Sequence, residues 1–199
     1  TMTEATSASQ IVGMPYGVTS QISTTQAPSS SFFGASVLKP GYTEILMEYS
    51  EVLFLLSEAN GWSQSYYEQG VRASMEKWNI DSAKINAFVA ALPPANKQNV
   101  LTQKYVSLFM QPFEAWAEYR RTGYPNTLLL PGQSAALNVA TASGQTTYTF
   151  TSLIADLTDL PTRIYYPTTV QTLNTDNYNA ASTAIGGDKM NTKLIWDKN

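Results

Sequence analysis

A segment bounded by proline and glycine, Pro112–Pro125 (PFEAWAEYRRTGYP), constrains the fold of this chain more than any other. Proline suits the first position of a helix, where its missing N–H needs no partner. Arg120 and Arg121 fall in the last turn, where positive charge complements the helix dipole. Gly123 then stops the helix, and Pro125 prevents it from continuing. The segment therefore predicts a short helix with defined ends.

The side chains of this helix predict a buried aromatic face. The residues of that face share helical spacing, namely Phe113, Trp116, Ala117 and Arg120. Arginine side chains can clamp ligand carboxylates or sugar hydroxyls, but they can also bind C-terminal carbonyls and stack on neighbouring rings. For Arg120, Arg121 and Arg163 we favour the structural role.

Upstream, two helices joined by a short turn are expected to form a helical hairpin. The first, Thr43–Asn60, stops at Gly61, and Ser63 caps the second, which runs to about Trp78. Gly70 lies inside the second helix at a cost of about 1 kcal/mol relative to alanine, so we expect it to allow close approach of the first helix. The apolar stripe of the first helix is Tyr49, Val52, Leu53, Leu56 and Ala59. The inner face of the second is Tyr67, Val71, Ser74, Met75 and Trp78.

The hairpin has about the length of a tetratricopeptide unit, roughly 34 residues. Because such a hairpin cannot bury its apolar face alone, we expect further helices beside it. Two follow in the sequence, Asp81–Leu92 with Asp81 as its cap and Asn96–Gln111.

Beyond Pro125 the pattern changes. The segments Leu137–Thr141 and Thr146–Phe150 flank a turn at Ser143–Gly144 and predict a small β-hairpin. The rest is rich in Pro, Asn, Tyr and Gly, with one short helix expected over Asp176–Ala184. The predicted fold class is therefore mostly α, with tetratricopeptide-like helical hairpins, a loop-rich C-terminal region and a small β-hairpin.

Composition excludes several classes of function. Only 14% of the 199 residues are charged, below the typical share of about 25%, which suits a neutral ligand. The net charge of −3 argues against nucleic-acid binding. The chain has no cysteine and no histidine, which excludes disulfides, the usual zinc sites and histidine-based proton transfer. Asp188 with Asp176 or Asp197 lacks the spacing of an EF-type loop, so we predict neither a metal site nor a cofactor.

Several motifs, taken in order, resemble the SusD/RagB-like family, and the resemblance covers roughly Lys39–Asn199. They are Tyr49–Ala59 (YSEVLFLLSEA), Tyr66–Trp78 (YYEQGVRASMEKW), Thr102–Phe109 (TQKYVSLF), Glu114–Pro125 (EAWAEYRRTGYP), Leu160–Pro167 (LPTRIYYP), Asn174–Ala180 (NTDNYNA) and Gly186–Asp197 (GGDKMNTKLIWD). The resemblance implies a cell-surface lipoprotein of the outer membrane that captures an oligosaccharide or related nutrient for a TonB-dependent transporter.

The same resemblance implies a domain organisation. Residues 1–199 would be the C-terminal part of a single SusD-like domain, with a loop-rich lead (1–41), a helical block (42–125) and a β-hairpin with a loop-rich tail (126–199). Members of the family carry a lipid on an N-terminal cysteine. We therefore expect the membrane anchor and an N-terminal half to lie outside this chain.

No pair of acids in the sequence predicts catalysis. Glu114 and Glu118 are one helical turn apart, and paired carboxylates are the signature of glycosidases. Acids at this spacing are also typical of a solvated helix face, and Glu118 can pair with Arg120 or Arg121. We therefore predict a binding protein without enzymatic activity.

Aromatic residues in loops are the predicted ligand-binding residues. Sugar rings present C–H faces that pack on aromatic rings, and in the resembled family ligand platforms often come from loops. The residues we select are Tyr16, Phe32, Phe33 and Trp62. The alternative is a tetratricopeptide-like scaffold that binds a peptide or protein partner in a concave groove.

Overall fold

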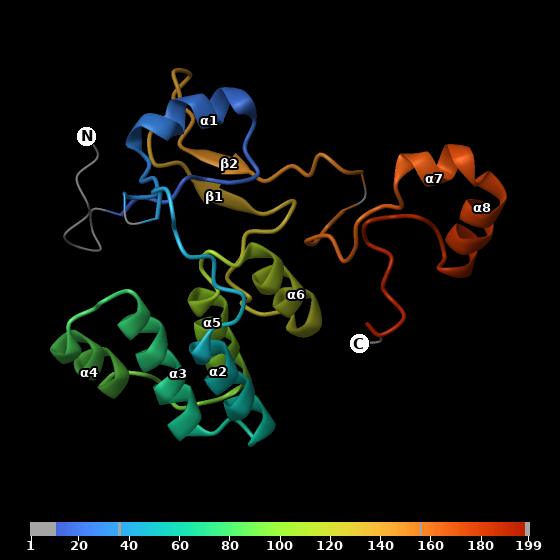
Figure 1. The fold of residues 1–199 in the computed structure, drawn as a ribbon. Helices are drawn as coiled ribbons and strands as arrows, with labels where there is room; N and C mark the ends of the chain where they lie inside the picture. The colour runs from blue at the N-terminus through green and yellow to red at the C-terminus, as the bar shows by residue number, and fades with distance from the viewer. Residues whose placement is uncertain (1–10, 36, 156, 198–199) are drawn as a thin grey trace. The chain divides into compact units, whose positions relative to one another are not determined.

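The computed structural model describes residues 11–35, 37–155 and 157–197, and Figure 1 shows their fold. It is mostly helical, with one small antiparallel sheet, so the predicted fold class is confirmed. Within this described part of the chain, no helix has both the length and the apolar character needed to cross a membrane.

The chain divides into two compact units. Unit 1 combines the two ends of the chain, Thr1–Tyr42 and Leu129–Asn199, and unit 2 is the block Thr43–Leu128. The helices of unit 2 are α2 (Tyr49–Ala59), α3 (Gln64–Lys77), α4 (Ser82–Ala90), α5 (Lys97–Ser107) and α6 (Pro112–Thr122). Unit 2 thus contains the helices predicted between residues 43 and 122.

Local capping signals set the ends of these helices. The Asp81 carboxylate accepts hydrogen bonds from the backbone N–H groups of Ala83 and Lys84, which caps α4 as predicted. The Asn96 side chain does the same for α5 through the N–H of Asn99. Pro112 begins α6, and Gly123 ends it in the left-handed conformation at φ +72°.

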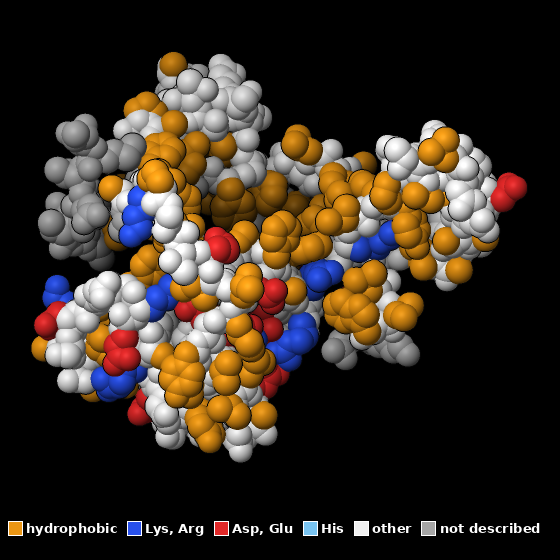
Figure 2. All heavy atoms as spheres, viewed as in Figure 1, with side chains coloured by type: hydrophobic (Ala, Val, Ile, Leu, Met, Phe, Trp, Pro, Cys, Tyr) orange, Lys and Arg blue, Asp and Glu red, His pale blue; other side chains and the backbone are white. Residues whose placement is uncertain are grey.

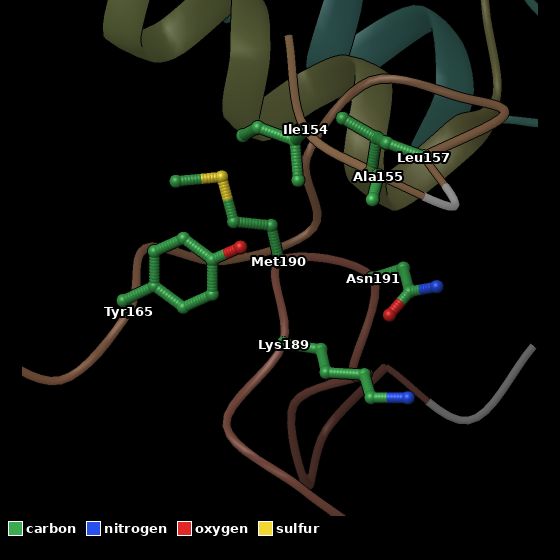
Figure 3. A pocket seen from close by; sticks show the side chains of 7 residues that line it. All are labelled: Ile154, Ala155, Leu157, Tyr165, Lys189, Met190 and Asn191. Atoms are coloured by element: carbon green, nitrogen blue, oxygen red, sulfur yellow. The ribbon is translucent and has the colours of Figure 1, made fainter. Parts of the chain in front are cut away.

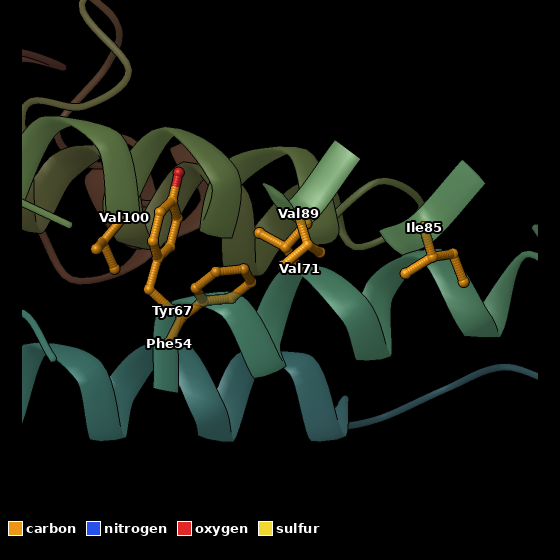
Figure 4. Packing of buried hydrophobic residues seen from close by; sticks show 6 residues of the cluster. All are labelled: Phe54, Tyr67, Val71, Ile85, Val89 and Val100. Atoms are coloured by element: carbon orange, nitrogen blue, oxygen red, sulfur yellow. The ribbon is translucent and has the colours of Figure 1, made fainter. Parts of the chain in front are cut away.

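The core of unit 2 forms where α2, α3, α4 and α5 meet. Figure 4 shows its cluster of buried side chains, which are Phe54, Tyr67, Val71, Ile85, Val89 and Val100. Phe54 is 1% exposed and packs against the Tyr67 ring at a centroid distance of 6.4 Å. A Cβ on Gly70 would lie 2.9 Å from Cε1 of Phe54. The close approach predicted for Gly70 is therefore confirmed, with the Phe54 ring as the neighbour.

The buried face of α2 differs from the predicted stripe. The helix begins at Tyr49, six residues after the predicted Thr43, and it buries Ser50, Leu53, Phe54 and Ser57. Tyr49 and Leu56, assigned to the inner face, are exposed. The helix is apolar on both sides, so periodicity alone does not choose between them. The inward face is the one on which Phe54 meets Gly70 and the Ser57 hydroxyl donates to the carbonyl of Ser63 at 2.8 Å.

The buried face of α6 was also wrongly predicted. Phe113 is 76% exposed, and the residues that turn inward are Ala115, Glu118 and Tyr119. The physical reason is Lys104 of α5, which is almost fully buried and takes the Glu118 carboxylate as its partner at 3.1 Å. Pairing this ammonium outweighs burying one more aromatic ring.

Unit 1 corrects the prediction for the lead, of which residues 1–10 and 36 lie outside the described residues. The lead was expected to be irregular, but it contains α1 (Ser20–Gln26) and a 3₁₀ turn (Ala27–Ser29). The buried Gln26 side chain forms two hydrogen bonds with the backbone of Val139, one to the carbonyl and one from the N–H, at 2.7 and 3.0 Å. This long-range pairing fixes α1 beside the hairpin (Figure 1).

The β-hairpin is confirmed, but its first strand lies earlier than predicted. Strand β1 is Ser134–Ala136 and pairs antiparallel with β2, Thr147–Thr149. The predicted segment Leu137–Thr141 instead belongs to the connection between the strands. Its first residue donates to the carbonyl of Thr146 at 2.8 Å, and Gly144 turns at φ +83°.

The tail of unit 1 contains two short helices. The predicted helix is present as α8, Thr175–Ala184, and it is preceded by α7, Thr168–Leu173, which was not predicted. Figure 2 shows that the visible face over α7 and α8 carries mainly uncharged polar and hydrophobic side chains. This agrees with the sequence of the two helices, in which Asp176 is the one charged residue.

The Gly70 contact gives a test of the core. We expect Gly70→Ala to lower the free energy of unfolding by about 1–2 kcal/mol, because overpacking costs roughly 1–3 kcal/mol and the gain in helix propensity returns only about 1 kcal/mol. Urea denaturation would measure it. Gln69→Ala, exposed on the same helix, is the matched control and should stay within about 0.5 kcal/mol of the wild type.

The cause is tested by a double mutant. In a Phe54→Leu background, which removes the ring, the cost of Gly70→Ala should shrink. An equal cost in both backgrounds would show that the Phe54 contact is not its origin.

Candidate functional site

A network of ion pairs connects α2, α5 and α6 inside unit 2. The Lys104 ammonium lies 3.1 Å from the Glu118 carboxylate and 3.9 Å from that of Glu51. The Arg121 guanidinium pairs with both oxygens of Glu58, at 2.7 and 2.6 Å, and with Glu118 at 2.7 Å. A separate pair joins Lys77 to Glu48, which also accepts a hydrogen bond from Gln111.

These contacts shift the pKa values of two carboxyl groups in opposite directions. The hydrogen bonds from Arg121 hold the pKa of Glu58 below its ordinary value of 4.5. Burial raises the pKa of Glu51, and the positive charge of Lys104 only partly opposes that shift. The Glu58 shift follows from ion pairing and the Glu51 shift from burial, so neither shift by itself points to catalysis.

The network decides the role of the predicted acid pair. Glu118 is buried and pairs with Lys104 and Arg121. The predicted pairing with an arginine of the same helix is thus confirmed for Arg121, and Glu118 is not on a solvated face. Glu114 is exposed, whereas Glu118 is buried in the ion-pair network. Within the described residues, no cluster of three acidic, histidine or cysteine side chains could hold a metal ion.

The predicted aromatic residues of the lead lie in unit 1. Phe32 and Phe33 follow the 3₁₀ turn and are about half exposed, at 54% and 50%. The Tyr16 ring packs edge-on against Phe150, with ring centroids 5.8 Å apart. Two short segments adjoin here, because the N–H of Ser31 donates to the carbonyl of Val12 at 2.7 Å. Three of the four predicted ligand-binding residues therefore belong to adjoining segments of one unit.

Tyr16 is held in a fixed orientation. Its hydroxyl donates to the carbonyl of Leu129 at 3.0 Å and accepts from the N–H of the same residue at 2.6 Å. The Tyr148 hydroxyl in turn donates to the Tyr16 carbonyl at 2.9 Å. Since its hydroxyl is already engaged, Tyr16 offers a ligand a ring surface rather than a hydrogen-bonding group.

Trp62, the fourth predicted residue, lies in unit 2. It follows Gly61 in the turn between α2 and α3, with φ +65°. Its ring is half-buried and packs against the core cluster. Trp62 therefore belongs to a different unit from Tyr16, Phe32 and Phe33.

The two tail motifs LPTRIYYP and GGDKMNTKLIWD meet in unit 1. Arg163 pairs with Asp188 at 2.9 Å and stacks over the Tyr166 ring at 4.6 Å. The N–H of Thr162 donates to the carbonyl of Met190 at 2.8 Å. In unit 2, Arg120 likewise stacks over Trp116, at 4.1 Å. The structural role favoured for these arginines agrees with these contacts.

Where the two motifs meet they border a recess of about 140 Å³, called here the tail recess (Figure 3). Its lining residues are Ile154, Ala155, Leu157, Tyr165, Lys189, Met190 and Asn191. Sequence reasoning did not select any of these as site residues. The available signal was that both motifs carry polar and aromatic residues, here Tyr165, Lys189 and Asn191.

Comparison with known proteins places the chain in a family. The model of a SusD-like family described as "Starch-binding associating with outer membrane" matches residues 1–149. The chain belongs to the SusD-like family. The match includes the loop-rich lead, which the sequence motifs left out, and it ends before the tail motifs.

Solved structures of similar proteins support the same assignment. One, described as a SusD-like protein of Bacteroidetes AC2a, is 31% identical, with a TM-score of 0.61, over 78% of this chain and 30% of its own length. Another, described as a chitin-binding protein, is 30% identical, with a TM-score of 0.56, over 76% of this chain and 33% of its own. This SusD-like chain thus spans about a third of the length of these relatives. No curated protein matches it.

The Glu58–Arg121 pair predicts a pH-dependent stability. Because its folded pKa lies below 4.5, Glu58 contributes stability that is fully present above its unfolded pKa and is lost as the pH falls through the folded pKa. Glu58→Gln should therefore cost about 1 kcal/mol at pH 7 and progressively less below pH 4 or so. Urea midpoints across this range measure it, with Glu114→Gln, exposed on α6, as the control. A cost independent of pH would contradict this account.

The packing of Gly17 against Phe150 gives a test of how Tyr16 is held. The residue has φ +72°, and a Cβ there would overlap the ring of Phe150. We expect Gly17→Ala to destabilise unit 1 by about 2 kcal/mol and to increase hydrogen exchange at Leu129, whose N–H the Tyr16 hydroxyl accepts. Gly13→Ala, with open space around the position and no positive φ, is the matched control. Equal exchange in both variants would exclude this role.

Proposed function

We propose that this SusD-like protein binds glycans at the cell surface of the outer membrane. The observation that carries the proposal is the family match over residues 1–149, whose description names starch binding and outer-membrane association. A chitin-binding relative at 30% identity supports a carbohydrate ligand. The half-exposed rings of Phe32 and Phe33, with the fixed ring of Tyr16, supply stacking surfaces in the same matched region.

The protein captures its ligand without chemical turnover and passes it to a TonB-dependent transporter. The absence of turnover is supported by three carboxylates of unit 2, since Glu58 and Glu118 are engaged in ion pairs and Glu114 is exposed to solvent. The chain acts as part of a longer SusD-like domain anchored by an N-terminal lipid. The greater length of the solved relatives supports the longer domain, and the lipid anchor is what the family resemblance implies.

A scaffold that binds a peptide or protein is the second candidate. It is favoured by the outward face of α2, where Tyr49, Leu55 and Leu56 are exposed and apolar. Helical hairpins bury such faces against neighbouring helices. The same face equally suits further helices of the SusD-like domain, so we rank this candidate second.

Binding without turnover is the decisive test. Isothermal titration with maltoheptaose and with chitohexaose should show binding of at least one of them, and chromatography of the same mixtures should show no product. Phe32→Ala and Phe33→Ala should each weaken binding roughly fivefold, as expected for loss of about 1 kcal/mol of aromatic contact.

Leu38→Ala is the control for these variants, since it removes an exposed apolar side chain of the same lead that has no ring. It should leave affinity unchanged. Release of shorter oligosaccharides, or equal affinity in all three variants, would refute the respective part of the proposal.

A further inference from the structure

Hydrogen bonds and an ion pair join two of the segments that line the tail recess of unit 1. Thr162 donates its N–H to the carbonyl of Met190 at 2.8 Å, and its hydroxyl donates to the same carbonyl at 2.9 Å. Asp188 is nearly buried, pairs with Arg163 and accepts from the N–H of Tyr166. These bonds hold the segment that carries Tyr165 against the segment 189–191. Two of the segments that line the recess are therefore fixed to one another before any ligand arrives, which lowers the entropic cost of binding.

Three of the residues that line this recess carry polar side-chain groups. They are the Tyr165 hydroxyl, the Lys189 ammonium and the Asn191 amide. Within the described residues, none of these groups makes a hydrogen bond or ion pair, although their backbone neighbours are densely bonded. Figure 3 shows the Lys189 and Asn191 side chains leaving the backbone on the same side. A bound ligand would therefore form hydrogen bonds with the Lys189 ammonium and the Asn191 amide without breaking a hydrogen bond between them and another described residue.

The rest of the lining is apolar. Ile154, Ala155, Leu157 and Met190 contribute aliphatic or thioether groups, and Figure 3 shows the Ile154 and Met190 side chains directed toward one another. A matching ligand group combines a small apolar end with an adjacent polar amide. The volume of about 140 Å³ suits one substituent of a sugar rather than a chain of sugars.

We propose that the tail recess binds the acetamido group of an N-acetylated hexosamine. The acetyl methyl packs between Ile154 and Met190, and the acetyl carbonyl accepts from the Lys189 ammonium. The sugar N–H donates to the Asn191 oxygen, while a C–H face of the sugar rests on the Tyr165 ring. The inference rests on the proposed glycan-binding function and adds the class of sugar and a second place on the chain.

Other sugar classes fit the lining less well. A uronic acid would bring its carboxylate against the aliphatic wall. An ion pair with the exposed Lys189 would offset little of the free energy lost when that carboxylate is dehydrated. A plain hexose would place a hydroxyl where Ile154 and Met190 offer no partner, which loses a hydrogen bond to water. The acetamido group satisfies both sides of the recess.

Saturation-transfer NMR on the wild-type chain tests the inference. The probes are N,N′-diacetylchitobiose, maltose as the disaccharide without acetamido groups, and glucuronic acid as the anionic sugar. Diacetylchitobiose should show its strongest saturation at an acetyl methyl and should bind roughly tenfold more tightly than either other probe. Stronger binding of glucuronic acid, or equal binding of maltose, would overturn the acetamido assignment.

Variants locate the site. Asn191→Ala and Lys189→Ala change exposed side chains without structural bonds, and each should weaken diacetylchitobiose binding severalfold and reduce the acetyl saturation. Leu173→Ala, at a position 85% exposed on α7, is the control and should bind as the wild type does. If glycans bind but both recess variants behave as the wild type, the recess inference fails and the proposed function stands. If neither these probes nor the longer oligosaccharides bind the wild type, both fail.

Discussion

A buried lysine is the constraint on which the helical block depends. Lys104 is 2% exposed, and an ammonium in such a place is stable only beside a carboxylate, since breaking a buried pair costs about 3–5 kcal/mol. Glu118 of α6 supplies that carboxylate, and Arg121 then connects Glu118 to Glu58 of α2. The segment EAWAEYRRTGYP thus carries the partners of a pairing that joins α2, α5 and α6.

This constraint separates what the sequence could predict from what it could not. The ends of α4 and α6 were predictable because Asp81, Pro112 and Gly123 act on their own neighbours in the chain. Gly70 was predictable as a close contact, although its partner Phe54 was not. The buried faces of α2 and α6 were not predictable from periodicity. On α2 both faces are apolar, and on α6 the choice depends on Lys104, which lies 14 residues before Glu118 in the sequence.

The missed elements of unit 1 have the same origin in long-range contacts. α1 is anchored by Gln26, whose partner Val139 is 113 residues away, and no local pattern announces such a bond. The register of β1 against β2 also depends on contacts outside the strands, such as the N–H of Gly132 donating to the carbonyl of Phe150 at 2.8 Å. α7 is rich in threonine, which forms helices poorly, so it gave no helical signal.

Of the candidate site, the loop aromatics were predicted from the sequence and the recess was not. Tyr165 and Lys189 line one recess only after the tail folds, and they are 24 positions apart in the sequence.

The placement of charge connects the fold to the proposed ligand. The chain has few charged residues, and Lys77, Lys104, Arg121 and Arg163 each pair with a carboxylate inside their own unit. Charge is thereby used largely for holding helices and tail segments together. Recognition at the exposed surface then depends on ring stacking and hydrogen bonds, which are weak unless their groups are well oriented. The proposed role agrees with the fixed Tyr16 hydroxyl on the Leu129 backbone. It also agrees with the backbone bonding of the tail recess, around side chains that form no bond within the described residues.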